Sequence, residues 1–149
     1  MIGELSHAQI EHLIKTKSYG RLACQSDEGI YIVPISYVFD GEFIYGHSQE
    51  GMKISYMRRN PKVSMLIDEI NTMNNWWSVM IRAEYEELEA GPLKLRALQM
   101  LDDRLITISL SGALISDGGP SQKSGLLEKA TQPIVFRLKL TEKSGRFEK

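Results

Sequence analysis

The chain has 149 residues, the length of one domain over residues 1–149, and it is long enough to bury a core without disulfide or metal crosslinks. Its 18 basic and 19 acidic side chains leave a formal net charge of −1, so it lacks the positive field that attracts nucleic acids and anionic membranes. A single cysteine excludes an internal disulfide, and no stretch approaches the ~20 apolar residues that a membrane span needs. We therefore expect one cytoplasmic domain that binds neither nucleic acid nor membrane.

The first predicted element is a helix that begins after Ser6. Gln9 stands three residues further on, the spacing of a capping box, and Leu5 and Ile10 are placed to pack together across the cap. Apolar residues at positions 10, 13 and 14 give this helix one buried face, and residues 18–20 end it. Residues 21–25 then begin a series of short strands.

Strands and a tight turn dominate the next segment. Residues 30–39 are apolar at nearly every position, which predicts a central barrel strand covered on both faces, as one facing another subunit would be. The Asp40-Gly41 pair is typical of a tight hairpin, so residues 43–48 should return antiparallel to that strand. Residues 51–59 have the pattern of a short helix that ends at Asn60-Pro61, and residues 62–68 have that of the next strand.

The remaining elements complete a chain rich in strands. The polar residues 69–75 predict a loop, and residues 76–88 predict a strand with positions 77, 79, 81, 83 and 85 on one face. Pro92 opens a helix through about residue 101. Residues 104–115 fit neither period cleanly and are assigned to helix, residues 116–124 form a loop, and residues 133–141 alternate as a strand. Six strands with two or three helices indicate a small α+β or barrel architecture.

The segment 47–53 carries the groups that bind a phosphate. Ser48 ends a strand, Gly51 allows close approach of the backbone, and Lys53 lies in the first turn of the following helix. The hydroxyl, the ammonium and the free N–H groups of a helix start are donors that a phosphate prefers. An ordinary strand-to-helix turn with a solvated lysine is the other interpretation of this pattern.

Pro34 interrupts the apolar strand. Because proline cannot donate a hydrogen bond to a neighbouring strand, it marks a sheet edge or a place where the strand lies against something else. In the second case Ile35 and Ser36 would offer backbone and hydroxyl groups to a planar polar ring, and Gly46 across the hairpin would let a bulky group approach. An edge strand with nothing bound also explains Pro34.

Few other residues could carry chemistry. His47 ends a strand beside the phosphate motif and could donate a hydrogen bond or a proton, although a lone histidine is more often structural. His7 and His12 lie five residues apart on the first helix and do not share a face, so we expect no metal site. Trp77 and Ser78 indicate a core, a dimer interface or a wall that stacks on a bound ring. No Ser-His-Asp set or pair of catalytic carboxylates supports hydrolysis.

Short segments along most of the chain stand in a distinctive order and spacing. They are Gly20-Arg21-Leu22-Ala23, Ile32-Val33-Pro34-Ile35-Ser36-Tyr37, Ile44-Tyr45-Gly46-His47-Ser48 with Gly51 and Lys53, Arg58-Arg59-Asn60-Pro61-Lys62-Val63, Trp77-Ser78-Val79, Phe136-Arg137-Leu138 and Ser144-Gly145-Arg146. Outside residues 104–132, this arrangement resembles the pyridoxamine 5'-phosphate oxidase-like FMN-binding split-barrel family, particularly its nitroimidazole-resistance (Nim-type) branch. The resemblance implies a mainly β (α+β) fold: a six-stranded split β-barrel of Greek-key type with a few flanking helices, assembled as a homodimer.

The same resemblance implies a cofactor and the residues that contact it. FMN, or alternatively FAD, would bind at the subunit interface of the homodimer and pass electrons to a small-molecule acceptor. The implied contacts are Pro34, Ile35 and Ser36 at the flavin ring, Ser48 and Lys53 at its phosphate, His47 as the active-site histidine beside the cofactor, and Trp77 and Ser78 of the partner subunit. The implied function is a flavin-dependent oxidoreductase that reduces nitroaromatic or similar acceptors. A non-catalytic module that holds flavin, haem or another planar ligand is the alternative.

Overall fold

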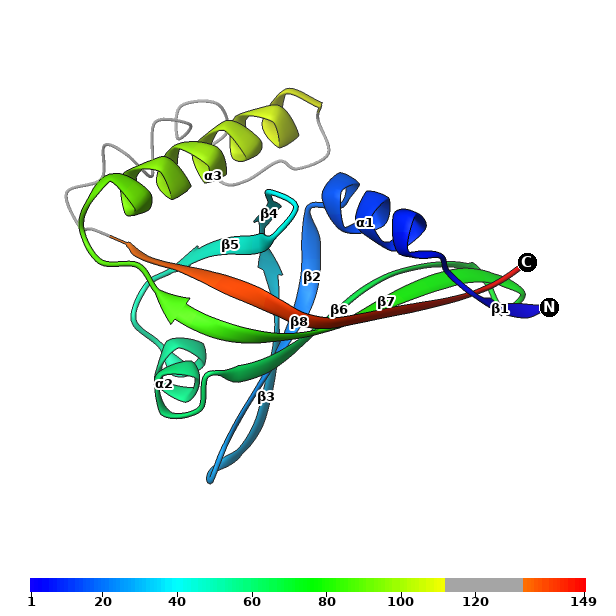
Figure 1. Ribbon diagram of the computed structural model, residues 1–149, viewed down its shortest axis with the longest axis horizontal. Helices are drawn as coiled ribbons and strands as arrows, with labels where there is room; N and C mark the ends of the chain where they lie inside the picture. Colours follow the sequence, from blue (N-terminus) through cyan, green and yellow to red (C-terminus); the bar gives the residue numbers. More distant parts are fainter. Residues whose placement is uncertain (112–132) are drawn as a thin grey trace.

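The computed structural model describes the backbone of residues 1–111 and 133–149, and the side chains of residues 1–104 and 133–149. In these ranges the chain forms one antiparallel sheet with helices packed against it (Figure 1). In chain order the elements are β1 (Ile2–Glu4), α1 (His7–Thr16), β2 (Tyr19–Ser26), β3 (Gly29–Ser36), β4 (Val38–Phe39), β5 (Phe43–Ser48), α2 (Met52–Arg59), β6 (Lys62–Thr72), β7 (Asn75–Glu87), α3 (Pro92–Ser111) and β8 (Ile134–Glu148). The predicted loop at residues 116–124 lies outside the described residues, as do residues 112–115 of the predicted helix.

The sheet is curled into a half-barrel. Its strands follow the order β3-β2-β6-β7-β8-β5-β4, and β1 pairs with the end of β8. The long strands β6, β7 and β8 cross the molecule together, while β2 and β3 leave them at a steep angle (Figure 1). The prediction of a mainly β fold with a few flanking helices is therefore confirmed.

The described sheet has eight strands, so the prediction of six is wrong. The predicted strand 30–39 is divided into β3 and β4 at Tyr37. The backbone N–H of Tyr37 donates to the carbonyl oxygen of Ser18 at 3.1 Å, and its hydroxyl donates to that of Ile14 at 2.6 Å. Tyr37 is thus anchored to the end of α1, and the chain changes its strand partner there. The other additional strand, β1, has only three residues and pairs with residues 146–148.

The position of β3 corrects part of a second prediction, that of a central strand, whereas the expected cover by another subunit stays a prediction. Among the described residues β3 pairs only with β2 and forms an edge of the sheet. Ile30 and Ile32 are 67% and 64% exposed, so the strand is not covered on both faces within one chain. The apolar run suggested a central strand, but the side chains at even positions, Pro34 included, point away from the core. An edge position agrees with the presence of Pro34.

Two hairpins test the predicted turns. At Asp40-Gly41 the N–H of Asp40 donates to the carbonyl oxygen of Phe43 at 3.1 Å, and Gly41 has a φ of +101°, so this hairpin is confirmed. The loop predicted at residues 69–75 is wrong, because β6 and β7 continue as a paired hairpin that turns at residues 73–74. Its polar side chains project beyond the core, and pairing of the backbones rather than burial sustains the two strands there.

The helices begin where their caps predict. At α1 the Ser6 side chain accepts from the N–H of Gln9, and the Gln9 side chain accepts from the N–H of Ser6, which confirms the capping box. The helix α3 continues from Pro92 to Ser111, so the two helical segments predicted there are one. Arg104 of α3 donates to the carbonyl oxygens of Thr16 and Lys17, which end α1.

Within the described residues, no helix combines the length and the apolar character that crossing a membrane requires.

The core consists of two clusters on opposite sides of β5. The first fills the half-barrel beneath α1 and α2, and its fully buried members include Ile14, Leu22, Ile44, Ile54, Met57, Ile81, Phe136 and Leu138. The second lies under α3 and contains Tyr45, Leu88, Ala97, Leu98, Leu101 and Val135. Because neighbouring residues of a strand point to opposite faces, β5 sends alternate side chains into the two clusters.

Candidate functional site

The change of strand partner at Tyr37 opens the sheet on both sides of that residue. On one side, residues 33–36 of β3 pair with β2 alone. On the other, β4 pairs only with Ile44 and Tyr45, so Gly46 and Ser48 lie beyond the point where β4 runs beside β5. Strand edges of this kind present backbone N–H and C=O groups, which are strong hydrogen-bonding partners for a ligand. The predicted ring site and the predicted phosphate site therefore lie on the two edges that part at Tyr37.

The three residues predicted to meet the ring lie in sequence along β3. Pro34 is opposite Arg21, Ile35 is opposite Gly20, and Ser36 ends the strand. Pro34 is exposed and Ser36 half-buried on one face, while Ile35 is buried in the first core cluster on the other face. Ile35 could therefore meet a ligand at that edge only through its backbone.

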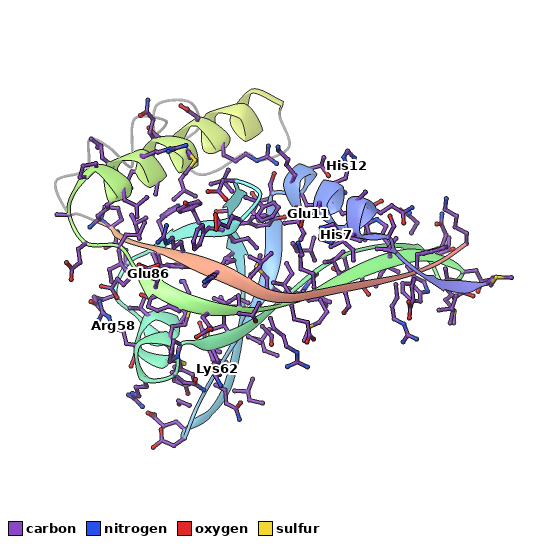
Figure 2. All side chains as sticks on the ribbon, in the orientation of Figure 1. His7, Glu11, His12, Arg58, Lys62 and Glu86 are labelled. Atoms are coloured by element: carbon purple, nitrogen blue, oxygen red, sulfur yellow. The ribbon has the colours of Figure 1, made fainter. Side chains whose placement is uncertain are left out.

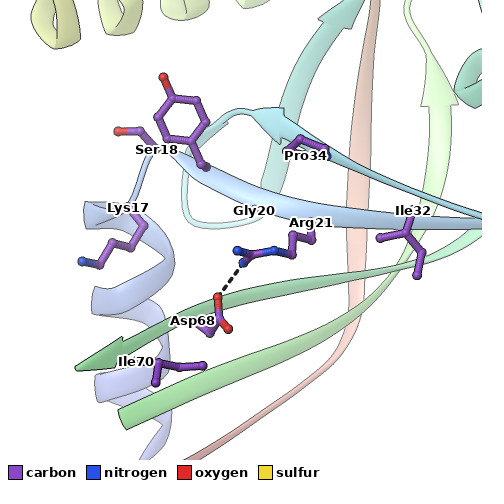
Figure 3. Close-up of a pocket in the computed structure, with 9 residues that line it drawn as sticks. Lys17, Ser18, Gly20, Arg21, Ile32, Pro34, Asp68 and Ile70 are labelled. Carbon is purple, nitrogen blue, oxygen red and sulfur yellow. Dashed lines mark hydrogen bonds and ion pairs between the residues drawn. The ribbon is translucent and has the colours of Figure 1, made fainter. Parts of the chain in front are cut away.

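Pro34 lines an open pocket of about 760 Å³ on the outer face of β2, β3 and β6 (Figure 3). Its lining combines exposed apolar side chains, Ile32 and Ile70, with a hydrogen-bonded ion pair. In that pair, Arg21 Nη1 donates to Asp68 Oδ1 at 2.7 Å. The pocket thus combines an apolar surface with a polar ion pair, a combination that suits a planar ring with a polar edge. Sequence reasoning missed Arg21 and Asp68, since 47 positions separate them.

The phosphate turn, residues 48–53, joins the end of β5 to α2. No side chain caps the start of α2 at Gly51, so the N–H groups of the first helical turn have no side-chain partner there. Ser48 Oγ donates to the carbonyl oxygen of Gln49 at 2.7 Å, and the half-buried Lys53 lies within the first turn. The three donors that the sequence predicts for a phosphate are thus brought to one strand-to-helix junction.

Lys53 also lies close enough to β2 to influence the single cysteine. Burial raises the pKa of the Cys24 thiol to about 11, against the opposing attraction of the Lys53 ammonium. Cys24 is buried and stays protonated near neutral pH, so it is not a nucleophile. The neutral Cys24 thiol therefore does not form an ion pair with Lys53.

His47 and Ser48 leave β5 on opposite faces. His47 pairs with Val135 and shares the face of the second core cluster with Tyr45, under α3. Ser48 shares the other face with Gly46, which lies opposite Phe136 of the first cluster. The two side chains predicted to serve one site therefore do not act from the same side of the strand.

Gly46 has a structural role that differs from the one predicted. A Cβ at this position would lie 2.6 Å from Cζ of Phe136, far inside contact distance. The glycine is therefore required by the packing of the Phe136 ring. The space above the strand is filled by this chain, so Gly46 does not leave room for a ligand on that face.

Trp77 and Ser78 likewise point to opposite faces of β7. Trp77 packs against the first core cluster, and the ammonium of Lys17 lies 5.5 Å from the centre of one of its rings. Ser78 pairs with Asp68 and so shares the outer face with the pocket that Pro34 lines. Of the predicted residues, Pro34, Ser36 and Ser78 thus share one face of the sheet, whereas Ser48 and Lys53 do not line that pocket.

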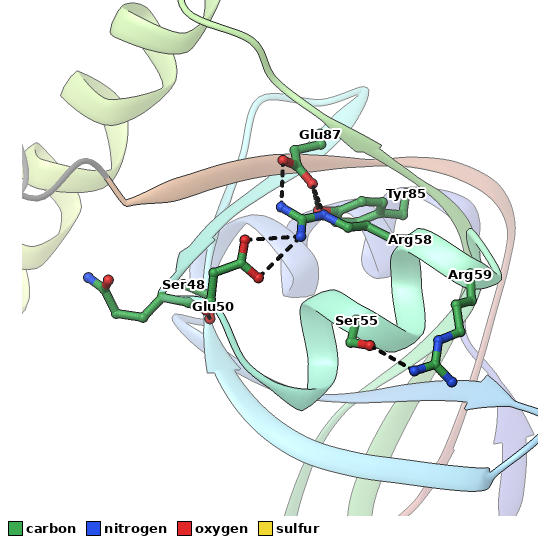
Figure 4. Close-up of polar contacts among 8 residues, drawn as sticks. Ser48, Glu50, Ser55, Arg58, Arg59, Tyr85 and Glu87 are labelled. Carbon is green, nitrogen blue, oxygen red and sulfur yellow. Dashed lines mark hydrogen bonds and ion pairs between the residues drawn. The ribbon is translucent and has the colours of Figure 1, made fainter.

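A network of charged side chains encloses the outer side of the phosphate turn (Figure 4). Arg58 Nε and Nη2 donate to the two carboxylate oxygens of Glu87 at 2.8 and 2.9 Å, and Nη1 donates to Glu50 at 3.1 Å. The Tyr85 hydroxyl also donates to Glu87, at 2.8 Å. The hydrogen bonds from Arg58 hold the pKa of Glu87 below its usual value. The helix pattern placed Arg58 near the C-terminus of α2, but nothing in the sequence links it to Glu87.

The remaining histidines do not add to this site. His7 and His12 both lie on α1, away from Arg58 on α2 (Figure 2). Among the residues with described side chains, no group of three or more His, Cys, Asp or Glu could hold a metal ion.

Residues 6–147 match the family model described as pyridoxamine 5'-phosphate oxidase. An uncharacterized protein from Rhizobium meliloti (strain 1021) is 40% identical over 86 residues. That match covers 58% of this chain and 57% of the relative, so the chain spans little more than half of that relative. The crystal structure of an FAD-binding protein from Mesorhizobium loti is 27% identical, with a TM-score of 0.72 over 100% of this chain and 99% of the other.

Two more distant structures share the fold alone. A candidate 5-nitroimidazole antibiotic resistance protein from Bacteroides thetaiotaomicron is 17% identical, with a TM-score of 0.63 over 99% of this chain and 87% of the other. A heme storage protein from Vibrio cholerae is 15% identical, with a TM-score of 0.69 over 95% of this chain and 93% of the other. The Nim-type branch is thus one structural neighbour among several.

Proposed function

The chain belongs to the pyridoxamine 5'-phosphate oxidase family, and from this premise we propose that it binds a flavin and passes electrons to small nitroaromatic or similar acceptors. The flavin would be FMN, with FAD as the alternative, because both carry a phosphate that the turn between β5 and α2 would hold. The FAD-binding protein from Mesorhizobium loti supports a flavin, since it resembles this chain over its whole length.

One observation carries the proposal: the phosphate turn combines an uncapped helix start with a serine and a lysine. The helix start supplies free N–H groups and the positive end of the helix dipole. Ser48 and Lys53 add a hydroxyl and an ammonium at the same junction. A flavin phosphate seated there would meet the backbone N–H groups, the hydroxyl and the ammonium at one junction.

The ring would extend from the phosphate turn toward the other strand edge. There the backbone of Pro34, Ile35 and Ser36 would meet its polar atoms. Trp77 and Ser78 of the partner subunit would approach the cofactor at the interface of a homodimer. Because the two side chains leave β7 on opposite faces, Ser78 would offer its side chain and the core-packed Trp77 would not. The exposed side chains of Ile30 and Ile32 support this arrangement, because a second subunit would cover apolar surface that β3 leaves open.

The flavin would supply the redox chemistry, and the protein would bind and orient it. Ser48 and Lys53 would hold the phosphate, and the edge of β3 would set the orientation of the ring. His47 is the candidate proton donor. Because its side chain leaves β5 on the face opposite Ser48, a proton from His47 would serve the ring or the acceptor rather than the phosphate.

The test begins with the absorbance spectrum of the purified protein. We expect flavin bands, and after anaerobic reduction we expect the flavin to be reoxidised faster when a nitroimidazole is added. Suppose that flavin bands are present but no acceptor in a panel of nitroaromatics and quinones speeds reoxidation. The reductase hypothesis would then be rejected, and the protein would be a flavin-binding protein only. A Soret band in place of flavin bands would favour a module that holds haem.

A further inference from the structure

One arginine holds the phosphate turn from outside. Arg58 lies in the last turn of α2, yet its Nη1 reaches back to both carboxylate oxygens of Glu50, at 3.0 and 3.1 Å. Its Nε and Nη2 donate to Glu87 at the end of β7. Figure 4 shows the guanidinium between the two carboxylates. A single side chain therefore joins the turn, the helix and the sheet.

The turn needs such support because little else restrains its middle. Gln49, Glu50 and Gly51 are exposed, and a Cβ at Gly51 would meet nothing nearer than the Gln49 carbonyl oxygen at 3.9 Å. Glycine in open space leaves the backbone free to adopt many conformations. The helix that follows has only eight residues and no side-chain cap. The contact between Arg58 and Glu50 thus fixes the segment that sets the direction of the first helical N–H groups.

We propose that Arg58 is a positioning residue for the flavin phosphate, which it serves by holding Glu50, and with it residues 49–51, in the conformation that binds. The inference rests on the proposed function, since it assumes a phosphate at this turn. The geometry favours it: the planar guanidinium binds Glu87 through two parallel hydrogen bonds and still has a donor for Glu50. Glu87 is itself fixed by the Tyr85 hydroxyl. The guanidinium is thus pre-ordered before Glu50 joins it.

A direct role for Arg58 as a phosphate ligand makes the opposite prediction for one variant. Glu50, Glu87 and Arg58 together carry a formal charge of −1. Removal of Glu50 makes this group neutral, which by charge alone should strengthen the binding of a phosphate. If Glu50 instead serves to hold the turn, its removal should weaken binding despite the gain in charge. The sign of the change for Glu50→Ala therefore separates the two roles.

The experiment measures the dissociation constants of FMN and of riboflavin, which lacks the phosphate, for the flavin-free protein. We expect Arg58→Ala and Glu50→Ala each to weaken FMN about fivefold to tenfold, because the turn must then be ordered on binding. Riboflavin affinity should not change. The double variant should lose no more than either single variant, because both substitutions break the same contact.

Arg59→Ala is the matched control. It removes the same charge from the neighbouring position of α2, but Arg59 bonds Glu28 in the turn between β2 and β3, at 2.5 Å. We expect little change in FMN affinity.

An equal loss for Arg58→Ala and Arg59→Ala would overturn the inference in favour of general charge, and tighter binding by Glu50→Ala would overturn it in favour of a direct ligand. Because Glu50 is exposed, its variant keeps the fold even if that of Arg58 does not. Wild-type protein that binds neither FMN nor riboflavin would instead overturn the proposed function itself.

Discussion

Lys53 is the residue on which the proposed flavin binding would depend most directly. The residue lies in the first turn of α2, and no side chain caps the start of that helix at Gly51. Its positive charge acts to lower the pKa of the Cys24 thiol on β2, although burial outweighs it and raises that pKa to about 11. A lysine in the first turn of a helix can bind an anion that the helix dipole already attracts.

Lys53→Ala should weaken FMN about tenfold to a hundredfold, because a hydrogen bond to a charged group contributes about 1.5–3 kcal/mol. Riboflavin affinity should stay the same. Fluorescence titration of the flavin-free protein measures both. Lys62→Ala, at an exposed lysine just beyond α2, is the control and should bind FMN normally. Unchanged FMN affinity in Lys53→Ala would mean that the lysine is merely solvated.

Gly46 makes a prediction about stability rather than binding. Gly46→Ala would place a methyl group 2.6 Å from Cζ of Phe136, a fully buried ring. We expect a loss of about 1–3 kcal/mol in the free energy of unfolding, the usual cost of overpacking a core. Urea denaturation measures it. The Phe136→Leu exchange should recover part of the loss in the double variant, and full stability of Gly46→Ala would refute the packing explanation.

The β4–β5 hairpin shows how an element depends on one side chain. Asp40 Oδ1 accepts from the N–H groups of Glu42 and Phe43 at 2.8 and 2.7 Å, and Oδ2 accepts from the Tyr45 hydroxyl at 3.0 Å. Burial acts to raise the pKa of Asp40, but these hydrogen bonds outweigh it and lower the pKa. The ionised carboxylate therefore holds the turn together.

The hairpin should consequently weaken in acid. The folded-state pKa of Asp40 lies below the unfolded value of about 3.9, so its stabilisation is complete above that pH and is lost as the pH falls through the folded-state pKa. Urea unfolding between about pH 6 and about pH 2.5 should show a steeper loss for the wild type than for Asp40→Asn. Parallel pH profiles for the two proteins would contradict this role.

Elements with local signals could be predicted from the sequence, and elements set by distant partners could not. The capping box of α1 and the Asp40-Gly41 turn involve residues at most three positions apart, and both were predicted. The break at Tyr37 depends on hydrogen bonds to Ile14 and Ser18, and β1 depends on a strand at the other end of the chain. Neither hydrophobic periodicity nor a turn motif indicates contacts between residues so far apart in the sequence.

The candidate site shows the same limit at the scale of the whole molecule. The junction between β5 and α2 could be predicted because its signals are consecutive in the sequence, whereas phosphate binding at residues 48–53 stays a prediction. The separation of His47 from Ser48 and of Trp77 from Ser78 follows from the alternation of side chains along a strand. Which core cluster covers each face could not be predicted, because distant segments form both clusters. The partners that surround the site come from distant segments, as Arg58 and Glu87 do across 29 positions.

The expected homodimer makes a prediction of its own. Ile32 is 64% exposed on β3, so Ile32→Lys should leave the fold of one chain intact but place a charge in the interface. Light scattering should find a dimer for the wild type and a monomer for the variant, and the monomer should lose its flavin. Leu95→Lys on α3, at a residue that is 59% exposed, is the control and should remain a flavin-bound dimer. Flavin retained by a monomer would place the site within one subunit.

The mass of the ligand released by denaturing the purified protein tests the central claim most directly. A phosphate site at the turn between β5 and α2 requires a flavin that carries a phosphate, so we expect the mass of FMN or, in the alternative, of FAD. Release of riboflavin alone or of haem would contradict flavin-phosphate binding. So would protein that releases no planar ligand and does not bind added FMN.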